Sequence, residues 1–168
     1  MEPHLKTIFA GIRLIILDVD GVLTDGKIYW SMQGECMKVF NARDGFSVRK
    51  LTEAGYLFAI ITGGKTEMVA KRAEYMGVKH VFLNVTDKLA VFESFMQTVN
   101  INPKEVAYMG DDRIDLPVLK KVGLPACPKD AIPEVQSVCS FVSRYNGGCG
   151  AVRELCDAIW EVQHPCVG

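Results

Sequence analysis

The sequence predicts a single α/β domain over residues 1–168, built on a doubly wound, mainly parallel sheet of Rossmann-like type. Two observations predict it. Short apolar runs alternate with amphipathic helix patterns along the chain, which is typical of strands joined by crossover helices. The early runs are continuously apolar, as expected of parallel strands that are covered on both faces. One segment interrupts the alternation, because residues 27–40 read as a short β-hairpin around "QGE".

The elements follow in order along the chain. Strands are predicted at 13–17, 57–61, 80–83, 105–109, 124–127 and 140–143. Helices are predicted at 44–54, 65–76, 87–99, 113–122 and 149–162. Three of these helices end at a glycine, the usual C-terminal stop: Gly55, Gly77 and Gly123. The apolar start of the chain lacks a basic region and a convincing cleavage site, so we expect a lead-in to the first strand rather than a signal peptide.

Composition narrows the class of protein. The net charge of −1 predicts neither a nucleic-acid partner nor a membrane surface, and the apolar runs are too short to cross a bilayer. No CxxC pair or zinc-finger spacing occurs among the six cysteines, at positions 36, 127, 139, 149, 156 and 166. A chain of this length has a sufficient core without disulfides, so free thiols in a reducing cytoplasm are favoured.

Polar side chains follow the predicted strands where ligands bind in such sheets. Asp18 and Asp20 follow the first strand, Thr62 ends the second, and Asp111 follows the fourth. Each has an ordinary explanation alone: a turn or helix cap for the aspartates, an N-cap for the threonine. The carboxyl ends of parallel strands meet at one edge, however, which brings these groups together. Clustered carboxylates repel one another, and this edge therefore favours a Mg²⁺ site.

Such a set of groups can carry out phosphoryl transfer. A carboxylate can attack phosphorus and form an aspartyl-phosphate. Mg²⁺ and a lysine, here Lys88 at the start of a helix, can neutralise the transferring group. A second carboxylate can protonate the leaving oxygen and then activate water. The close spacing of Asp18 and Asp20 is explained if one faces phosphorus and the other faces the leaving group.

The motifs resemble those of the haloacid dehalogenase-like phosphatase superfamily in order and spacing. The resemblance is narrower to the 3-deoxy-D-manno-octulosonate (KDO) 8-phosphate phosphatases of lipopolysaccharide synthesis, and it covers nearly the whole chain. It is carried by "LDVDGVLTDG", "FNARDG", "AIITGGKTE", "AYMGDD", "VGLPACPKDA" and "GGCGAVRE".

The resemblance implies a role for each site residue. Asp18 is the implied nucleophile and Asp20 the general acid/base, while Thr62 and Lys88 hold the phosphoryl group. Mg²⁺ is bound by Asp18, the backbone carbonyl of Asp20, and Asp111. Outer support comes from Asp112 and Asp115. Substrate contacts are expected from Asp20, Asn41, Ala42, Arg43, Asp44, Gly45, Arg49, Gly63, Gly64, Arg72 and Lys88.

Two arginines near the C-terminal glycine-rich turn are further candidates for anion binding, Arg144 and Arg153. The turn at 146–150 either presents backbone N–H groups to an anion or is only a flexible connection.

The resemblance also implies how the site is covered. No separate cap domain is present, because the 27–40 hairpin is too short to close over a substrate. Its strands carry Tyr29, Trp30, Val39 and Phe40 and are candidates for pairing between subunits. A homotetramer in which neighbouring subunits close the site is therefore expected.

Four other functions compete with this interpretation. "GGKT" suggests a P-loop ATPase, but the glycine that this motif needs is replaced by Ala59. A phosphoacceptor signalling domain would place its acidic pair before the phosphorylated aspartate, and a stable phospho-switch should lack Asp20. A catalytically quiet oligomerisation domain of a sugar-nucleotide synthetase is disfavoured by the complete motif set. Phosphatases of nine-carbon 2-keto sugar acids remain the nearest alternative, and these resemble the chain but carry Glu where Gly64 stands.

Overall fold

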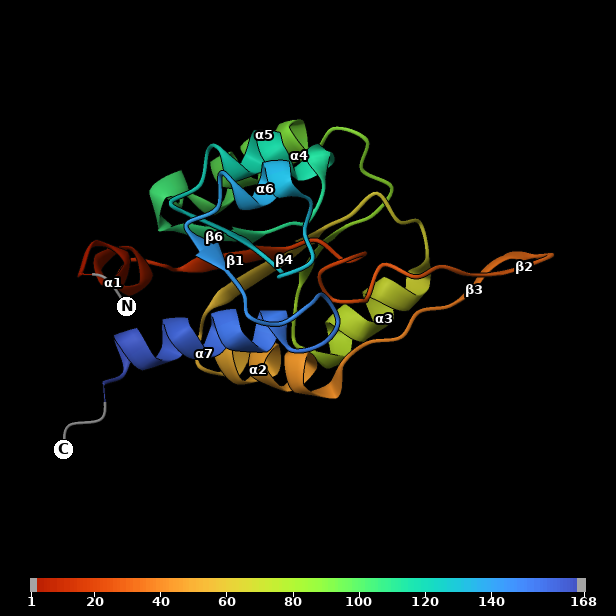
Figure 1. The fold of residues 1–168 in the computed structure, drawn as a ribbon, viewed down its shortest axis with the longest axis horizontal. Coiled ribbons are helices and arrows are strands. Elements are labelled where there is room, and N and C mark those ends of the chain that lie inside the picture. Colours follow the sequence, from red (N-terminus) through yellow and green to blue (C-terminus); the bar gives the residue numbers. More distant parts are fainter. Residues whose placement is uncertain (1–2, 166–168) are drawn as a thin grey trace.

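The computed structural model describes residues 3–165 and contains a six-stranded sheet in the order β5-β4-β1-β6-β7-β8, with every neighbouring pair parallel (Figure 1). Its strands are β1 (Leu14–Leu17), β4 (Leu57–Ile61), β5 (His80–Phe82), β6 (Val106–Met109), β7 (Leu124–Cys127) and β8 (Phe141–Val142). Each predicted strand is present. The predicted α/β class with a parallel sheet is therefore confirmed.

Helices cover both faces of the sheet (Figure 1). One face packs against α1 (Pro3–Ala10), α2 (Ala42–Glu53), α3 (Glu67–Tyr75) and α7 (Ala151–Gln163). The other face packs against α4 (Lys88–Val99), α5 (Leu116–Leu119) and α6 (Pro133–Gln136). None of the helices in residues 3–165 has the length and apolarity that a bilayer crossing requires.

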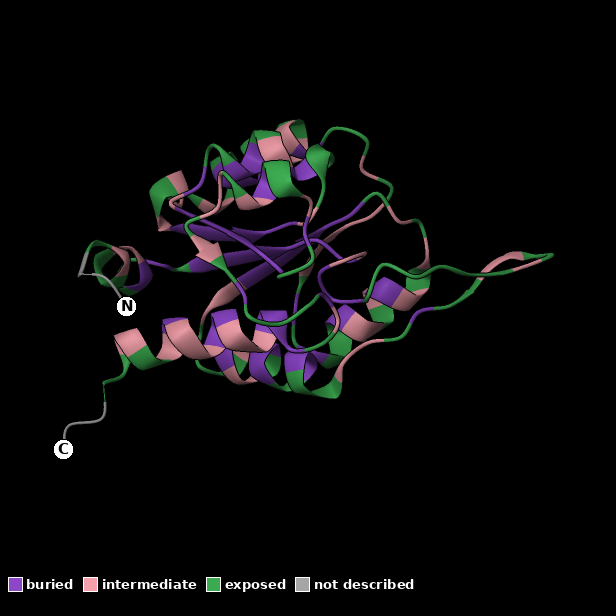
Figure 2. Ribbon diagram, in the orientation of Figure 1, coloured by how far each residue is buried: buried purple, intermediate pink, exposed green. Residues whose placement is uncertain are grey.

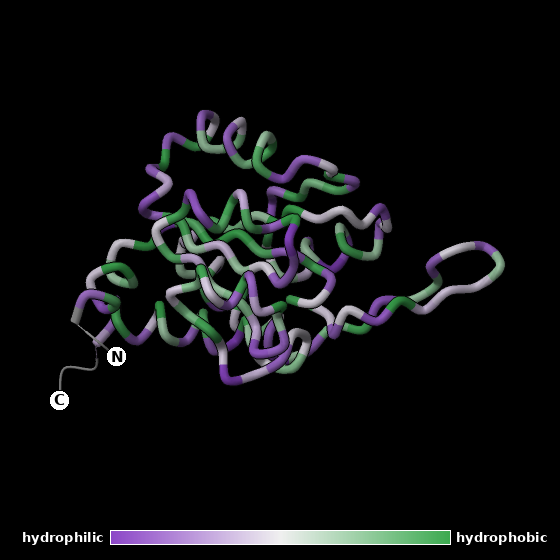
Figure 3. Tube along the Cα trace, turned by 45° about the horizontal axis from the view of Figure 1, so that its top comes forward, coloured by the Kyte–Doolittle hydropathy of each residue, from purple (hydrophilic) through white to green (hydrophobic). Residues whose placement is uncertain are grey.

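The central strand explains why the apolar runs are continuous. All four residues of β1 are fully buried; Ile15 and Leu17 join the core beneath α2 and α7, whereas Leu14 and Ile16 join the core beneath α4. Figures 2 and 3 show the same arrangement as a buried, apolar sheet inside more polar helices. Because side chains alternate between the faces of a strand, burial on both sides requires an apolar residue at each position.

The predicted hairpin is confirmed as a separate two-stranded antiparallel sheet, β2 (Tyr29–Ser31) and β3 (Gly34–Met37). It projects from the body of the protein as an arm (Figures 1 and 3). Trp30 is 73% exposed and Met32 fully exposed. Phe40 differs from the prediction: it is partly buried and packs against the core, with the Arg72 guanidinium over its ring, because the chain has by then rejoined the body.

The lead-in to the first strand forms a helix, α1, which was not predicted and whose Phe9 is buried against the core. Two local predictions were wrong. The helix expected at 113–122 is instead a 3₁₀ turn (Arg113–Asp115) followed by the four-residue α5, since Pro117 favours a fresh helix start. Gly123 is not a left-handed stop; a Cβ there would lie 2.0 Å from the carbonyl oxygen of Lys104. Short elements at Pro103–Glu105 and α6 were also missed.

Candidate active site

The predicted site residues do meet at one edge of the sheet, at the ends of β1, β4 and β6. Asp18 directly follows β1, and its backbone N–H donates to the carbonyl of Met109 at the end of β6. Thr62 directly follows β4, and its N–H donates to Phe82 O at the end of β5. Asp111 lies two residues beyond β6. The strand register therefore places all three groups at the edge where ligands bind in open α/β sheets.

Three carboxylates converge there. Asp18, Asp111 and Asp115 each offer an oxygen atom, and these atoms lie within 4.8 Å of one another. Glycines make the approach possible: a Cβ on Gly21 would lie 2.0 Å from Asp111 Oδ2, and one on Gly110 would lie 2.4 Å from Asp115 Cγ. The "DGV" and "GDD" glycines are thus steric requirements of the cluster.

Lys88 supplies the positive charge that the cluster needs. It begins α4 after the N-cap Asp87, and its side chain is 1% exposed. Its Nζ lies 2.7 Å from Asp18 Oδ2 and 2.7 Å from Asp115 Oδ1. Burial opposes the charge on Lys88, but the two carboxylates outweigh it and raise its pKa. Lys88 therefore stays charged, and one cation faces three carboxylates.

The excess of negative charge changes the acidity of the cluster. Burial, together with repulsion from Asp115, raises the pKa of Asp18 to about 6 although Lys88 counteracts it. Burial and repulsion from Asp18 and Asp115 raise the pKa of Asp111 to about 7. Oxygen ligands with unbalanced negative charge suit a hard divalent cation such as Mg²⁺. The residues present therefore fit the predicted metal.

Asp115 is held more firmly than its neighbours. It is fully buried and accepts hydrogen bonds from Lys88, from the Tyr108 hydroxyl at 2.6 Å, and from the backbone N–H groups of Asp111 and Asp112. This set of donors fixes its carboxylate beneath the other two. The side chain of Asp112 instead points to the turn, where it accepts from the N–H of Arg113.

Tyr108 was not predicted as a site residue. It is buried in β6, and burial followed by the charge of Asp115 raises the pKa of its hydroxyl well above the usual value, so that it remains a donor. The signal in the sequence is a single polar group within the apolar run "VAYM".

Asp20 and Thr62 lie beside each other at the open side of the cluster. Thr62 is buried and accepts a hydrogen bond from Gly64 N at 3.1 Å. The Asp20 side chain is 36% exposed. A Cβ built on Gly64 would lie 3.4 Å from Thr62 Oγ1 and 3.5 Å from Asp20 Oδ2, which places Gly64 between the two. A second residue missed from the sequence, Lys38, lies with Nζ 2.5 Å from Asp20 Oδ1.

Comparison with known proteins gives this geometry a family. Residues 81–155 match the sequence model of the haloacid dehalogenase-like hydrolases. The 3-deoxy-D-manno-octulosonate 8-phosphate phosphatase KdsC of Salmonella typhimurium is 43% identical over 159 residues, which cover 95% of this chain and 85% of that protein. The chain belongs to this phosphatase family.

Solved structures of the family have the same fold. The crystal structure of the Yersinia pestis phosphatase has a TM-score of 0.94 and 42% identity, and the match covers 97% of this chain and 88% of that one. The Moraxella catarrhalis phosphatase, solved with a magnesium ion, a phosphate ion and a KDO molecule, has a TM-score of 0.93 and 31% identity, and the match covers 97% and 94%.

Only some of the predicted substrate residues lie together. Asn41, Gly45 and Arg72 cluster together, because Arg72 Nη2 donates to Asn41 O at 3.2 Å and a Cβ on Gly45 would lie 2.0 Å from that nitrogen. Arg72 Nε is buried and has no hydrogen-bond partner among residues 3–165. Arg49 lies on the surface, paired with Glu53 at 2.8 Å. Ala42 and Gly63 are exposed.

Asp44 has a structural role in the phosphatase. It is buried and accepts hydrogen bonds from the backbone N–H groups of Gly150 and Arg153 at the start of α7. A carboxylate in that position satisfies N–H groups that the first helical turn leaves unpaired. Nothing in the "NARDG" pattern signals this use, since the partners lie more than a hundred residues away in the chain.

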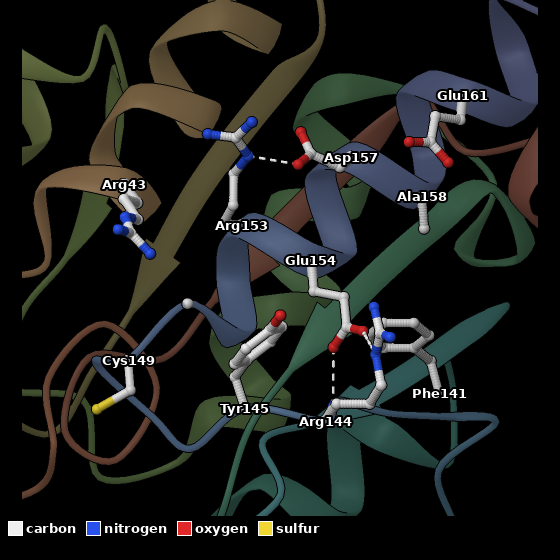
Figure 4. A pocket seen from close by; sticks show the side chains of 11 residues that line it. Arg43, Phe141, Arg144, Tyr145, Cys149, Arg153, Glu154, Asp157, Ala158 and Glu161 are labelled. Atoms are coloured by element: carbon white, nitrogen blue, oxygen red, sulfur yellow. Dashed lines mark hydrogen bonds and ion pairs between the residues drawn. The ribbon is translucent and has the colours of Figure 1, made fainter.

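A cavity of about 770 Å³ is lined by the remaining candidate arginines, Arg43, Arg144 and Arg153 (Figure 4). Arg144 pairs with Glu154 and Arg153 with Asp157, so both are already neutralised; Arg43 forms no ion pair within residues 3–165. The neighbouring turn is not a loose connection, because a Cβ on Gly147 would lie 1.8 Å from Gly21 O. Its glycines let the turn pack directly on the "DGV" loop.

Proposed function

We propose that this phosphatase hydrolyses 3-deoxy-D-manno-octulosonate 8-phosphate in lipopolysaccharide sugar biosynthesis, with Mg²⁺ as cofactor and an aspartyl-phosphate intermediate. The observation that carries the proposal is the buried contact of Asp18 with Lys88 next to Asp111, in a chain of this family. The M. catarrhalis relative was solved in complex with a KDO molecule.

Mg²⁺ would be held by the carboxylates of Asp18 and Asp111 and the backbone carbonyl of Asp20, with Asp115 as outer support. When bound, the ion supplies positive charge that neutralises the phosphoryl oxygens. The raised pKa values of Asp18 and Asp111 support the assignment, because burial and, after it, repulsion from neighbouring carboxylates make the charged forms costly without a cation.

Asp18 is suited to attack phosphorus because both of its oxygens are held in place. Oδ1 accepts from the backbone N–H of Val19 at 2.7 Å, and Oδ2 contacts Lys88. A nucleophile fixed in this way loses little orientational freedom on reaching the transition state. Lys88, the Thr62 hydroxyl, and the N–H groups of Gly63 and Gly64 would bind the phosphoryl oxygens.

Asp20 completes the chemistry. Its Oδ2 lies on the side of Thr62 and Gly64, where a bound phosphate ester would present its leaving oxygen. Asp20 would give that oxygen a proton and then take one from the water that hydrolyses the intermediate.

The substrate's carboxylate would be recognised by guanidinium groups, which suit planar anions. Arg72 is supported as one of them by its buried, unpartnered Nε. Arg49 and Arg43 are the other candidates. A nine-carbon 9-phosphate is the second candidate substrate, and Gly64 favours the eight-carbon compound because it leaves the pocket edge without a side chain.

We further propose a homotetramer, joined through residues 27–40, that works in the cytoplasm. The exposed apolar side chains of the arm support the first proposal: Ile28, Trp30, Met32, Met37 and Val39 are 45–100% exposed. The free thiols of Cys36, Cys127, Cys139, Cys149 and Cys156 are compatible with a reducing compartment. Cys166 lies outside the described residues.

Phosphate release from KDO 8-phosphate tests the proposed function. The wild-type protein should turn over with Mg²⁺, and activity should vanish with EDTA and return when Mg²⁺ is restored. Asp18→Asn should abolish both turnover and the covalent intermediate. Ordinary turnover by Asp18→Asn, or none by the wild type on any phosphorylated sugar acid, would refute the assignment.

A further inference from the structure

Lys38 is an unusual residue for its place in the chain. It directly follows β3 of the projecting arm, where Met37 and Val39 on either side are exposed. The Lys38 side chain is nevertheless only 2% exposed, because it turns inward to the site. Lysine is rarely buried unless its charge is paired.

Two carboxylates pair that charge. Lys38 Nζ lies 2.5 Å from Asp20 Oδ1 and 2.7 Å from Glu35 Oε1, and Glu35 belongs to β3. Burial opposes the charge on Lys38, but these two contacts prevail and raise its pKa, so the side chain is a cation. Lys38 therefore joins the arm to Asp20 by a charge-assisted hydrogen bond.

The two carboxylate oxygens of Asp20 have different surroundings. Lys38 holds Oδ1, for which the other partner, the Thr24 hydroxyl, is distant at 3.4 Å. Oδ2 is left on the side of Thr62 and Gly64. Asp20 is partly exposed, so without Lys38 its carboxylate would be free to adopt other rotamers.

We propose that Lys38 is a positioning residue that aims Oδ2 of Asp20 at the leaving oxygen, and that Glu35 makes this aim depend on the conformation of the arm. The inference rests on the proposed acid–base role of Asp20. Among residues 3–165, the ion pairs of Lys38 are with Asp20 and Glu35, and neither Asp18 nor Asp111 is one of its partners.

The leaving group provides the test. A sugar alkoxide must be protonated as it leaves, whereas p-nitrophenolate is a stable anion that needs no proton. The value of kcat/KM reports the steps up to departure of the leaving group. Lys38→Met should therefore reduce kcat/KM for KDO 8-phosphate by roughly 10- to 100-fold, a part of the full effect of general acid catalysis, and reduce it for p-nitrophenyl phosphate by less than about threefold.

Two comparisons show whether Lys38 acts through Asp20. Asp20→Asn should show the same selective loss at larger size, and adding Lys38→Met to Asp20→Asn should cause no further loss. Lys38→Arg should recover most of the activity of Lys38→Met. Glu35→Gln leaves Lys38 charged and one anchor in place, so it should show the same selectivity at about two- to fivefold.

Lys121→Met is the matched control. Lys121 pairs with Glu93 at 3.5 Å, is 55% exposed and lies outside the arm, so both substrates should react as in the wild type.

Each outcome decides between the alternatives. An equal loss on both substrates, or a further loss in the Asp20→Asn background, would overturn the positioning role. If Lys38→Met fails to fold, the Glu35→Gln and Lys38→Arg values decide, because unselective effects in both would contradict the proposal. If Asp20→Asn itself shows no selectivity for the leaving group, the acid–base role in the proposed function fails instead.

Discussion

Asp18 Oδ2 and Lys88 Nζ lie 2.7 Å apart, and both side chains are almost completely removed from water. Removing the cation from such a pair leaves charge buried without compensation, which typically costs about 3–5 kcal/mol. Lys88→Met should therefore lower the free energy of unfolding by that order at neutral pH and abolish phosphatase activity. Urea unfolding without added metal measures the first effect.

Lys121→Met is the control for Lys88→Met. It breaks an exposed pair with Glu93 and should change stability by less than about 0.5 kcal/mol. An equal effect of both variants would contradict the buried-pair argument.

The second prediction concerns repulsion within the acid cluster. Asp111→Asn removes one of three converging carboxylates, so the metal-free protein should gain roughly 0.5–2 kcal/mol of stability, the usual range for a single stabilising substitution. The same variant should lose the rise in Tm that Mg²⁺ gives the wild type, because binding to the folded state alone stabilises it. Thermal unfolding with EDTA and with Mg²⁺ measures both. A destabilised metal-free variant, or an unchanged response to Mg²⁺, would refute this role of Asp111.

The third prediction follows from the pKa values of Asp18, about 6, and Asp111, about 7. Both exceed the value of 3.8 for an unperturbed aspartate, so the folded state binds protons more tightly than the unfolded state. These two groups should therefore make the metal-free protein more stable as the pH falls from 8 to 5, and the gain should stop near pH 4, about where the unfolded chain also protonates.

Surface carboxylates act in the opposite sense. Hydrogen bonds from arginine lower the pKa of Glu134, and side-chain contacts also lower that of Glu154, although partial burial works against the latter. The comparison should therefore be made between the wild type and the Asp18→Asn, Asp111→Asn double variant, by urea unfolding in EDTA. A wild-type pH slope no different from that of the double variant would show that the cluster does not bind the extra protons.

Most of the site could be predicted because it depends on topology. Asp18, Thr62 and Asp111 each follow a strand, and parallel strands bring their carboxyl ends to one edge whatever the details of packing. Lys88 could be predicted for a related reason, since it begins a helix at the same edge.

Contacts between distant, locally unremarkable segments could not be predicted. Lys38 reaches Asp20 across eighteen residues from an exposed arm, and no local periodicity indicates that its side chain turns inward. Asp44 shows the same limit, because its partners lie at the start of α7, more than a hundred residues away in the chain. The single helix predicted at 113–122 was wrong for another reason. The helix pattern was continued through Pro117, whose ring and missing N–H disfavour a helix interior.

The fourth prediction concerns assembly. Trp30→Lys places a charge on the exposed arm and should dissociate the proposed tetramer, raise KM and leave Tm nearly unchanged, since Trp30 contributes little to the core of a single chain. Light scattering measures the mass. Ile114→Lys, at an exposed apolar residue outside residues 27–40, is the control and should keep the wild-type mass. Phe40 is unsuitable for this test because its packing against the core would confuse dissociation with unfolding. A wild-type protein that is fully active as a monomer would contradict the proposed tetramer.

The last prediction concerns the choice between the two sugar acids. A Cβ on Gly64 would meet Thr62 Oγ1 and Asp20 Oδ2 at ordinary contact distances, and Gly64 does not have a positive φ, so a side chain can be accepted there and would project beside the reacting groups. Gly64→Ala should therefore fold and retain activity, as the matched control for size.

Gly64→Glu adds a carboxylate that can bond the hydroxyl groups of the longer sugar, and a site built to bond hydroxyls rejects a substrate lacking them more strongly than an empty edge does. The wild type should prefer KDO 8-phosphate with measurable activity on the nine-carbon 9-phosphate, and Gly64→Glu should narrow or reverse that preference while Gly64→Ala leaves it alone. Ratios of kcat/KM for the two substrates measure it. If the wild type prefers the nine-carbon substrate by about tenfold or more, a difference of some 1.4 kcal/mol in transition-state binding, the substrate assignment is wrong although the phosphatase chemistry stands.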